Sequence, residues 1–393
     1  MSFTFTISAK EGNARSGTIT TPHGDIKTPA FIPVGTKATV KSLTPEQVHA
    51  LGAQAVLSNT YHLYLQPGSD IIQKAGGLGA FMNWKMPTFT DSGGFQAFSL
   101  GTAFERGGSK LQDVSVEKVS EKKLATVTED GVTFKSVLDG STHIFTPEKS
   151  IEIQHEIGAD IIFVFDECTS PSDKKEYQKE AIERTHRWAK RCLVRHDELN
   201  AQQDIKQALF GIVQGGPFED LRKESAAVLG SMNFDGYGIG GSFSKQDIGT
   251  AVGWVNHILP ENKPRHLLGI GEPEDVLLAI AEGCDTFDCV AATRQARNGS
   301  AYTKNGRLNL RNSICKTTFE PIDTDCDCYT CINYTQSYIA HLFRADELLA
   351  HTLMSIHNLR YIIKLVDGAR LAIEQGVFEA YKIQKLEELR KQV

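Results

Sequence analysis

Residues 160–166 read DIIFVFD, a run of five apolar residues that lies between two carboxylates and ends at Asp166. A run of this length suits one buried strand better than a helix. Seven further short, mostly apolar runs occur along the chain, at residues 30–34, 53–58, 88–90, 208–213, 236–240, 266–270 and 286–290. We therefore expect eight short strands.

The segments between these runs carry apolar residues at spacings of three and four, which is typical of helices that pack on a sheet. We expect helices at residues 44–51, 147–157, 174–199, 218–229, 245–259 and 274–281. Pro45 and Pro147 fit the first turn of two of them. Strands that alternate with helices indicate parallel strands joined by right-handed crossovers. Eight such units close a barrel, and an open doubly wound sheet is the alternative.

Polar and glycine residues at the ends of the runs favour the barrel. In a barrel the carboxyl ends of the strands meet at one face, where active sites are built. The residues at or near these ends are Asn59, Asp91, Asp166, Gln214, Gly241, Gly269 and Asp288. A helix cap would explain Asp166 alone, but not the whole set. The sequence therefore predicts an α/β protein with a (β/α)8 TIM barrel.

Three regions fall outside the repeat. Residues 1–28 alternate as β-hairpins do, with a turn at 23–25. The barrel would span 29–300, interrupted by an insertion at 101–143 that contains a polar, lysine-bearing stretch and a hairpin through 129–131. Residues 301–393 hold a cysteine-rich segment and a long helical tail.

Composition sets broad limits on the class of protein. The 393 residues are 40% hydrophobic and 23% charged, with a net charge of −6, which argues against a disordered or fibrous chain. No apolar run is long enough to cross a bilayer, and the N-terminus lacks the pattern of a signal peptide, so we expect a cytoplasmic protein. Mild acidity does not exclude a nucleic-acid partner, because a local positive surface suffices for binding.

Three of the eight cysteines, Cys326, Cys328 and Cys331, lie within six residues. A chain of this length in a reducing compartment needs no disulfides. Zinc prefers four tetrahedral nitrogen or sulfur ligands, so the cluster predicts a zinc site near the C-terminus. The fourth ligand could be Cys315, His341, His351 or His357. A closed shell leaves no position for water, which makes the metal structural. Buried or redox-active thiols are the alternative.

Two carboxylates stand at the predicted polar face. Asp91 precedes a pair of glycines, and Asp288 lies in the last run. Two such groups are the minimum for glycosidic chemistry, in which one attacks the sugar carbon and the other transfers protons. Asp166 and Gln214 together would complement the donors and acceptor of a guanine edge. Each feature alone is weak, since barrels commonly carry aspartates at this face.

Two further motifs have competing explanations. Residues 236–241 match the dinucleotide-binding fingerprint, but the following segment lacks the helix start and the ribose-binding acid that the fingerprint requires. Residues 293–299 place Arg294 and Arg297 just after Asp288, where they would suit contacts to a polynucleotide. Solvated surface arginines would look the same.

Taken together, the motifs resemble the queuine (or preQ1) tRNA-ribosyltransferases, also called tRNA-guanine transglycosylases, over nearly the whole chain. The resemblance rests on residues 91–96, 165–168, 213–216, 268–271, 287–289 and the cysteine cluster. It implies a pentosyltransferase that exchanges guanine at the wobble position of certain tRNA anticodons for a 7-deazaguanine, preQ1 or queuine. It also implies that the (β/α)8 TIM barrel is irregular, that one structural Zn²⁺ has His357 as its fourth ligand, and that the protein is a homodimer.

The resemblance also implies roles for individual residues. Asp288 would be the nucleophile of a covalent ribosyl–enzyme intermediate, and Asp91 the general acid/base. The base would contact Ser92, Gly93, Gly94, Phe95, Asp166, Cys168, Gln214, Gly240, Gly241 and Leu268. The tRNA anticodon stem-loop would contact Gly269, Ile270, Gly271, Glu272, Pro273, Glu274, Asp275, Thr293, Arg294, Gln295, Ala296 and Arg297.

Two segments depart from the common bacterial pattern. Members of the family commonly follow the double glycine with a sequence near Leu-Ala-Val-Gly-Glu, whereas residues 240–245 here read GGSFSK. The insertion at 101–131 is also longer than is typical. A subgroup from host-dependent bacteria shares both features, which favours queuine over preQ1 as the entering base.

Two other classes compete with this interpretation. A non-catalytic partner subunit would keep the fold but lose the catalytic carboxylates, and both are present here. A zinc-dependent barrel hydrolase would need histidines at strand ends to hold a catalytic metal. No run ends in a His-x-His pair, and His62 is the one isolated candidate.

Overall fold

The computed structural model describes residues 3–99, 125–136, 138–240 and 248–391. Eight of its strands form one parallel sheet in the order β4-β14-β13-β12-β11-β10-β6-β5. A parallel bridge between Val34 and Leu57 brings the two outer strands together, so that the sheet is nearly closed. The predicted α/β TIM barrel is confirmed.

The eight barrel strands coincide with the eight runs expected from the sequence. They are β4 (Ala30–Pro33), β5 (Val56–Ser58), β6 (Thr88–Thr90), β10 (Ile161–Phe163), β11 (Ala208–Val213), β12 (Gly236–Ile239), β13 (Arg265–Leu267) and β14 (Thr286–Cys289). Nearly all of their residues are buried, as expected for parallel strands covered on both faces. Several of these strands are shorter than the apolar runs, because backbone pairing with the neighbouring strand stops before the run ends.

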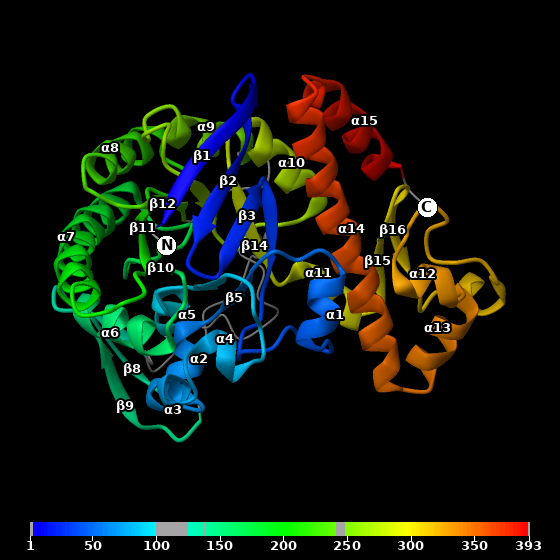
Figure 1. Ribbon diagram of the computed structural model, residues 1–393, viewed down its shortest axis with the longest axis horizontal. Coiled ribbons are helices and arrows are strands. Elements are labelled where there is room, and N and C mark those ends of the chain that lie inside the picture. The colour runs from blue at the N-terminus through cyan, green and yellow to red at the C-terminus, as the bar shows by residue number, and fades with distance from the viewer. Residues whose placement is uncertain (1–2, 100–124, 137, 241–247, 392–393) are drawn as a thin grey trace.

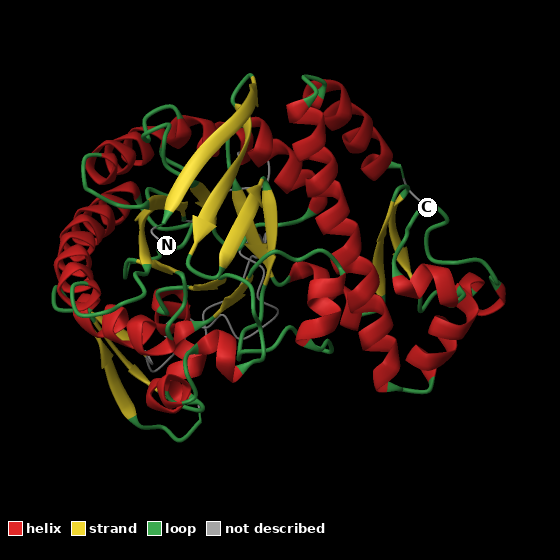
Figure 2. Ribbon diagram, viewed as in Figure 1, coloured by secondary structure: helices red, strands yellow, loops and turns green. Residues whose placement is uncertain are grey.

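Helices surround the strands (Figures 1 and 2). The six expected helices are present as α1 (Pro45–Ala50), α6 (Pro147–Ile157), α7 (Lys175–Asn200), α8 (Glu219–Gly230), α9 (Ile248–Asn256) and α10 (Pro273–Ala281). Thr44 caps α1 in a capping box with Gln47, and Pro147 occupies the first turn of α6. The first residues expected for α9 lie outside the described part of the chain.

Four short helices before residue 100 were not expected: α2 (Thr60–Leu65), α3 (Ser69–Lys74), α4 (Leu78–Phe81) and α5 (Gly94–Ser99). None exceeds six residues, which is shorter than the window of about 11 residues needed to recognise helical spacing of apolar residues in a sequence. Both α2 and α5 begin within a few residues of the end of a barrel strand, and they carry residues of the candidate site.

Two antiparallel sheets flank the barrel. The N-terminal hairpins form β1 (Thr4–Glu11), β2 (Ala14–Thr21) and β3 (Gly24–Thr28), as expected. Buried Arg15 of β2 forms an ion pair with Asp285, which precedes β14, so this sheet lies at the amino ends of the strands. The insertion contributes β7 (Ala125–Val127), β8 (Val132–Lys135) and β9 (Thr142–Phe145), with the expected hairpin through 129–131. Its lysine-bearing stretch lies outside the described residues.

The C-terminal part begins with α11 (Ala291–Arg297) and two short antiparallel strands, β15 (Ser300–Thr303) and β16 (Gly306–Asn309). The elements that follow are η2 (Ile314–Thr317), α12 (Tyr329–Asn333), α13 (Gln336–Arg344), α14 (Leu348–Glu374) and α15 (Phe378–Arg390). The long helix α14 runs between the barrel and the group formed by β15, β16, α12 and α13 (Figure 1). Among the described residues, no helix has both the length and the apolar character that a bilayer span requires.

Candidate active site and metal centre

Asp91 directly follows β6 and is held by groups from two neighbouring strand ends. Asn59, just after β5, donates its side-chain amide to Oδ2, and the backbone N–H of Thr60 donates to Oδ1 at 2.8 Å. Gln96 donates to Oδ2 at 3.1 Å, and the backbone N–H of Gly93 donates to Oδ1 at 3.2 Å. The carboxylate therefore has a fixed orientation at the carboxyl face of the barrel.

Burial raises the pKa of Asp91, and this effect outweighs the donors that lower it. The hydrogen bonds from Asn59, Thr60 and Gln96 act in the lowering direction, while the negative charge of Asp288 raises the pKa further. The two carboxylates are therefore electrostatically coupled, as expected of groups at one face.

Asp288 lies near the end of β14 and is 8% exposed. Its Oδ1 accepts two hydrogen bonds, one from the backbone N–H of Gly269 at 2.7 Å and one from Nε2 of His266 at 3.0 Å. Within the described residues, no group hydrogen-bonds to Oδ2. One oxygen is thus anchored, and the other remains available to a ligand.

Asp166, Ser92 and Gln214 form a buried polar group at the ends of three strands. Ser92 donates its hydroxyl to Oδ1 of Asp166 at 3.2 Å, and Gln214 donates its side-chain amide to Oδ2. The side-chain oxygen of Gln214 is buried without a hydrogen-bond partner among the described residues. A buried acceptor left unsatisfied costs about 1–3 kcal/mol, so a ligand that donates to it would gain that amount.

Two glycines of this face allow close packing around the polar group. A Cβ at Gly94 would lie 2.9 Å from the backbone oxygen of Asp166, and one at Gly240 would lie 2.9 Å from the amide nitrogen of Gln214. The backbone contact at Gly94 requires glycine, and a side chain at Gly240 would force the amide of Gln214 to shift. The sequence-predicted Gly241 lies outside the described residues.

The remaining residues predicted to contact the base lie at the same strand ends. Phe95 is the second residue of α5, Cys168 follows Asp166 by two residues, and Leu268 follows β13. All three side chains are partly exposed. Gly93 is buried beside Asp91.

The residues predicted to contact RNA differ in their exposure. Ile270, Gly271, Pro273, Asp275, Thr293 and Ala296 are buried, whereas Gly269, Glu272, Glu274, Arg294, Gln295 and Arg297 are partly exposed. We expect the second set to make any direct contacts. Glu272 accepts hydrogen bonds from the hydroxyl of Tyr302 at 3.0 Å and from Arg307, which links this loop to β15 and β16.

Two residues next to the carboxylates were not assigned to the site from the sequence. Asn59 was noted only as a strand-end residue, and His266 was counted within an apolar run. A histidine inside such a run is more often a satisfied core residue than a site residue. One feature of the sequence could have indicated His266, because a buried imidazole in an otherwise apolar run needs hydrogen-bond partners for both nitrogens.

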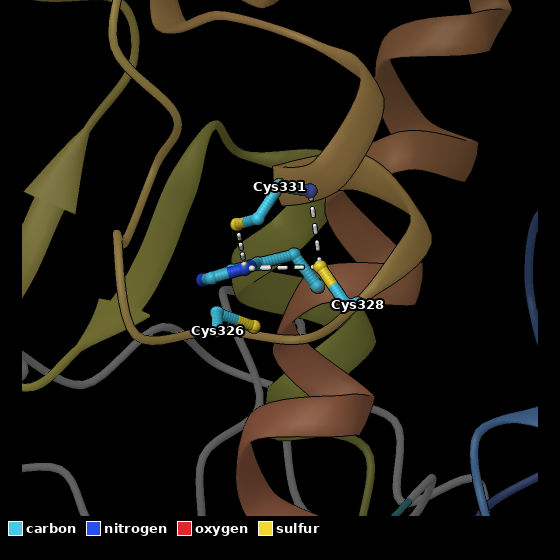
Figure 3. A group of neighbouring side chains, drawn as sticks. Cys326, Cys328 and Cys331 are labelled. Carbon is cyan, nitrogen blue, oxygen red and sulfur yellow. Dashed lines mark hydrogen bonds between the residues drawn. The ribbon is translucent and has the colours of Figure 1, made fainter.

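Cys326, Cys328, Cys331 and His357 form a second cluster, and their ligand atoms lie within 4.8 Å of one another. Nδ1 of His357 lies 3.2 Å from Sγ of Cys331 and 3.6 Å from Sγ of Cys328. In Figure 3 the three labelled thiols surround one point beside α12 and α14. Cys315, His341 and His351 are not members, and Cys315 instead bonds to the backbone of Asn309.

The donors of this cluster suit a metal ion. Nε2 of His357 lies 2.7 Å from the backbone oxygen of Tyr302, so it donates there and leaves Nδ1 free to ligate. Hydrogen bonds from Cys326 and Cys331 lower the pKa of the Cys328 thiol. Cys326, Cys328 and Cys331 form no disulfide with one another. The four predicted ligands are therefore brought together in a group that could hold a metal ion.

Comparison with known proteins is consistent with this geometry. The family model "Queuine tRNA-ribosyltransferase" matches residues 10–391. A queuine tRNA-ribosyltransferase from Desulforamulus reducens is 48% identical over 376 residues, which cover 95% of this chain and 94% of the relative. Relatives with the same name from Thermoanaerobacter pseudethanolicus and Fusobacterium nucleatum are 49% and 45% identical, over 95% and 96% of this chain and 93% and 96% of their own lengths. The chain belongs to the queuine tRNA-ribosyltransferase family.

Proposed function

We propose that this protein is a tRNA-guanine transglycosylase, a pentosyltransferase that exchanges guanine at the wobble position of tRNA anticodons for a 7-deazaguanine. The observation that carries the proposal is the pair of coupled carboxylates, in which Asp288 has one anchored and one available oxygen and Asp91 has a raised pKa. Glycosidic exchange needs a nucleophile and a proton carrier at one sugar.

The buried polar group supports guanine as the leaving base. Asp166 offers carboxylate oxygens to the N–H donors of guanine, and the unpartnered oxygen of Gln214 offers a further acceptor. Ser92 and Gly240 would hold this pocket in shape. A base at such a depth must first leave its stack in the RNA, as for other enzymes that act on bases.

The chemistry then follows in two steps. In the first, Oδ2 of Asp288 forms a bond to C1′ of the ribose while the C1′–N9 bond breaks. The departing guanine keeps the electron pair of the broken bond and receives a proton from Asp91. In the second, the entering base gives a proton to Asp91 and bonds through N9 to C1′, which releases Asp288. One glycosidic bond replaces another, so neither an external reductant nor a nucleotide triphosphate is needed.

The entering base that we propose is queuine. The proposal depends on residues 242–245, which replace the common bacterial sequence after the double glycine and lie outside the described residues. A competition between preQ1 and queuine for incorporation into tRNA measures this directly. A strong preference for preQ1 would reject queuine while leaving the exchange reaction intact.

The metal that we propose for the cysteine cluster is one Zn²⁺. Three thiolates and one imidazole complete a tetrahedral shell, so the ion would be structural and would offer no open position for a reactant. It would tie α12 to the middle of α14. Through His357 and the backbone of Tyr302 it would also fix β15, and we propose residues 301–393 as a zinc-bearing subdomain on the barrel.

A homodimer remains a proposal, and we assign its surface to α12 and α13. Ile332 is 70% exposed and Tyr338 is 40% exposed, and the rings of Tyr334 and Tyr338 stack with centroids 5.4 Å apart. Aromatic and aliphatic side chains gathered at a surface are typical of protein–protein contacts. Sedimentation at micromolar concentration should give twice the mass of one chain.

The two competing functions are less consistent with the site. A non-catalytic subunit would not be expected to keep both coupled carboxylates. A zinc-dependent hydrolase needs ligands at the barrel face, and among the described residues the metal-ligating group found is the one at Cys326 to His357.

The proposed function is tested by trapping the covalent intermediate. Incubation with tRNA in the absence of an entering base, followed by denaturing electrophoresis, should give an RNA–protein adduct attached at Asp288. Asp288→Asn should bind tRNA but give no adduct. Adduct formation at the normal rate by this variant would contradict the assignment of the nucleophile.

A further inference from the structure

We propose that His266 is a positioning residue for Asp288, in that it holds Oδ1 so that Oδ2 faces the ribose. This inference rests on the proposed function, because it concerns how that nucleophile is oriented. The carboxylate receives both of its hydrogen bonds on the same oxygen, from the imidazole of His266 at 3.0 Å and from the backbone of Gly269 at 2.7 Å.

The imidazole is fixed by its surroundings. His266 lies in β13 and is fully buried. The ring of Phe89 lies 5.6 Å from it and that of Phe163 lies 5.3 Å from it, centroid to centroid. Its second nitrogen, Nδ1, lies 2.9 Å from the hydroxyl oxygen of Thr286. Both ring nitrogens therefore have partners, and the ring has little freedom to turn.

Asp288 and Thr286 together favour one tautomer of His266, because an ionised carboxylate can only accept and the threonine hydroxyl can donate. Thr286 and Asp288 are two residues apart on β14, so their side chains leave the same face of the strand. A threonine hydroxyl can donate to Nδ1, which leaves the N–H on Nε2, facing the carboxylate. The opposite tautomer would set a lone pair against the oxygen of Asp288. The chain Thr286–His266–Asp288 is consistent only with the first arrangement when the carboxylate is ionised.

The consequence for the reaction is preorganisation. A carboxylate with one free oxygen and unrestricted torsion samples many orientations, of which few align a lone pair with C1′. Two donors on Oδ1 restrict this torsion before the substrate binds, so the cost of alignment is met during folding. A purely structural role for His266 would instead affect folding and leave the rate of attack per folded molecule unchanged.

The test compares variants by the rate of covalent adduct formation with tRNA. His266→Phe keeps a buried ring but removes the donor, and should slow adduct formation by roughly 10- to 100-fold, as expected for loss of one hydrogen bond to a charged group. The KM for tRNA should change by less than about twofold, because the ring does not touch the RNA in this scheme. His266→Gln places an amide N–H near the position of Nε2 and should restore most of the rate.

Two further variants keep the test decisive. Thr286→Val preserves the shape of the side chain but removes the partner of Nδ1, and should also slow adduct formation without a change in KM. This variant can be measured even where His266→Phe does not fold. His155→Phe replaces another buried histidine, on α6, and should leave the rate per folded molecule unchanged.

The outcomes separate the two proposals. Normal adduct formation by Asp288→Asn would overturn the proposed function. Loss of the adduct in that variant, together with a normal rate in folded His266→Phe or in Thr286→Val, would overturn the role of His266 alone. Failure of His266→Gln to exceed His266→Phe would also overturn it.

Discussion

Replacement of Asp166 by asparagine tests the proposed guanine pocket most directly. In the free protein both oxygens of Asp166 accept hydrogen bonds, from Ser92 and from Gln214. Asparagine keeps the shape but offers one acceptor and one amide donor. A serine hydroxyl can accept as well as donate, and a glutamine amide can turn over, so the variant should fold.

The cost should appear when guanine binds. An N–H group of the base that meets a carboxylate oxygen in the natural protein would meet an amide N–H in Asp166→Asn. Loss of a hydrogen bond to a charged group costs about 2 to 3 kcal/mol, which is roughly a 30- to 150-fold loss of affinity. The KM for guanine in a guanine-for-guanine exchange assay with labelled base measures this loss. The affinity for tRNA should remain close to that of the natural protein where backbone contacts dominate it.

A neighbouring buried acid provides the matched control. Glu167 is 1% exposed, like a pocket residue. Its carboxylate, however, accepts hydrogen bonds from the hydroxyl of Tyr177 at 2.6 Å and from Arg184, both of which lie on α7. Glu167→Gln should lower stability and leave the KM for guanine unchanged. A KM in Asp166→Asn within about threefold of the natural value, or an equal loss in Glu167→Gln, would refute the pocket as described.

Two further predictions concern stability. Cys331→Ser should lose the Zn²⁺ that we propose for the cluster, measured as zinc per chain, and should lower the melting temperature by about 5 °C or more. Cys315→Ser should keep the proposed metal. Equal zinc content in both variants would contradict the ligand set. Burial lowers the pKa of His155 to about 4 and that of His196 to about 3. In the unfolded chain both imidazoles have a pKa of about 6.5. Below that pH the unfolded chain therefore binds protons that the folded chain does not bind. The free energy of unfolding should therefore fall by about 2 kcal/mol from His155 alone between pH 7.5 and 5, measured by denaturant titration, and the loss should be smaller in His155→Phe.

The barrel could be predicted from the sequence because each strand is a separate, short apolar run with a polar or glycine end. The runs at 160–165 and 208–213 show this most clearly, since parallel strands buried on both faces need no alternation. The same regularity predicted that Asp91 and Asp288 share one face. These features depend on local sequence and on barrel topology alone.

The contacts around the carboxylates could not be predicted in the same way. The hydrogen bond from Asn59 to Asp91 joins residues 32 positions apart, and that from His266 to Asp288 joins residues 22 positions apart. Their existence depends on how neighbouring strands are shifted along the barrel, which apolar patterning does not specify. The short helices α2 and α5 were missed for a related reason, since tertiary contacts rather than periodicity stabilise them.

In the mechanism that we propose, the coupling between the two carboxylates would move one proton in the correct direction at each step. The charge of Asp288 contributes to the raised pKa of Asp91, after the larger effect of burial. If Asp288 becomes an ester as proposed, its charge disappears, so the pKa of Asp91 should fall just as the departing guanine needs a proton. When the entering base releases Asp288 the charge returns, and the pKa of Asp91 should rise as that base gives up its proton. The variant Asp288→Asn imitates the ester, and a carbon NMR titration should show a lower pKa for Asp91 in it than in the natural protein. An unchanged or higher value would mean that the charge of Asp288 does not control the pKa of Asp91, and would refute this account of the proton transfer.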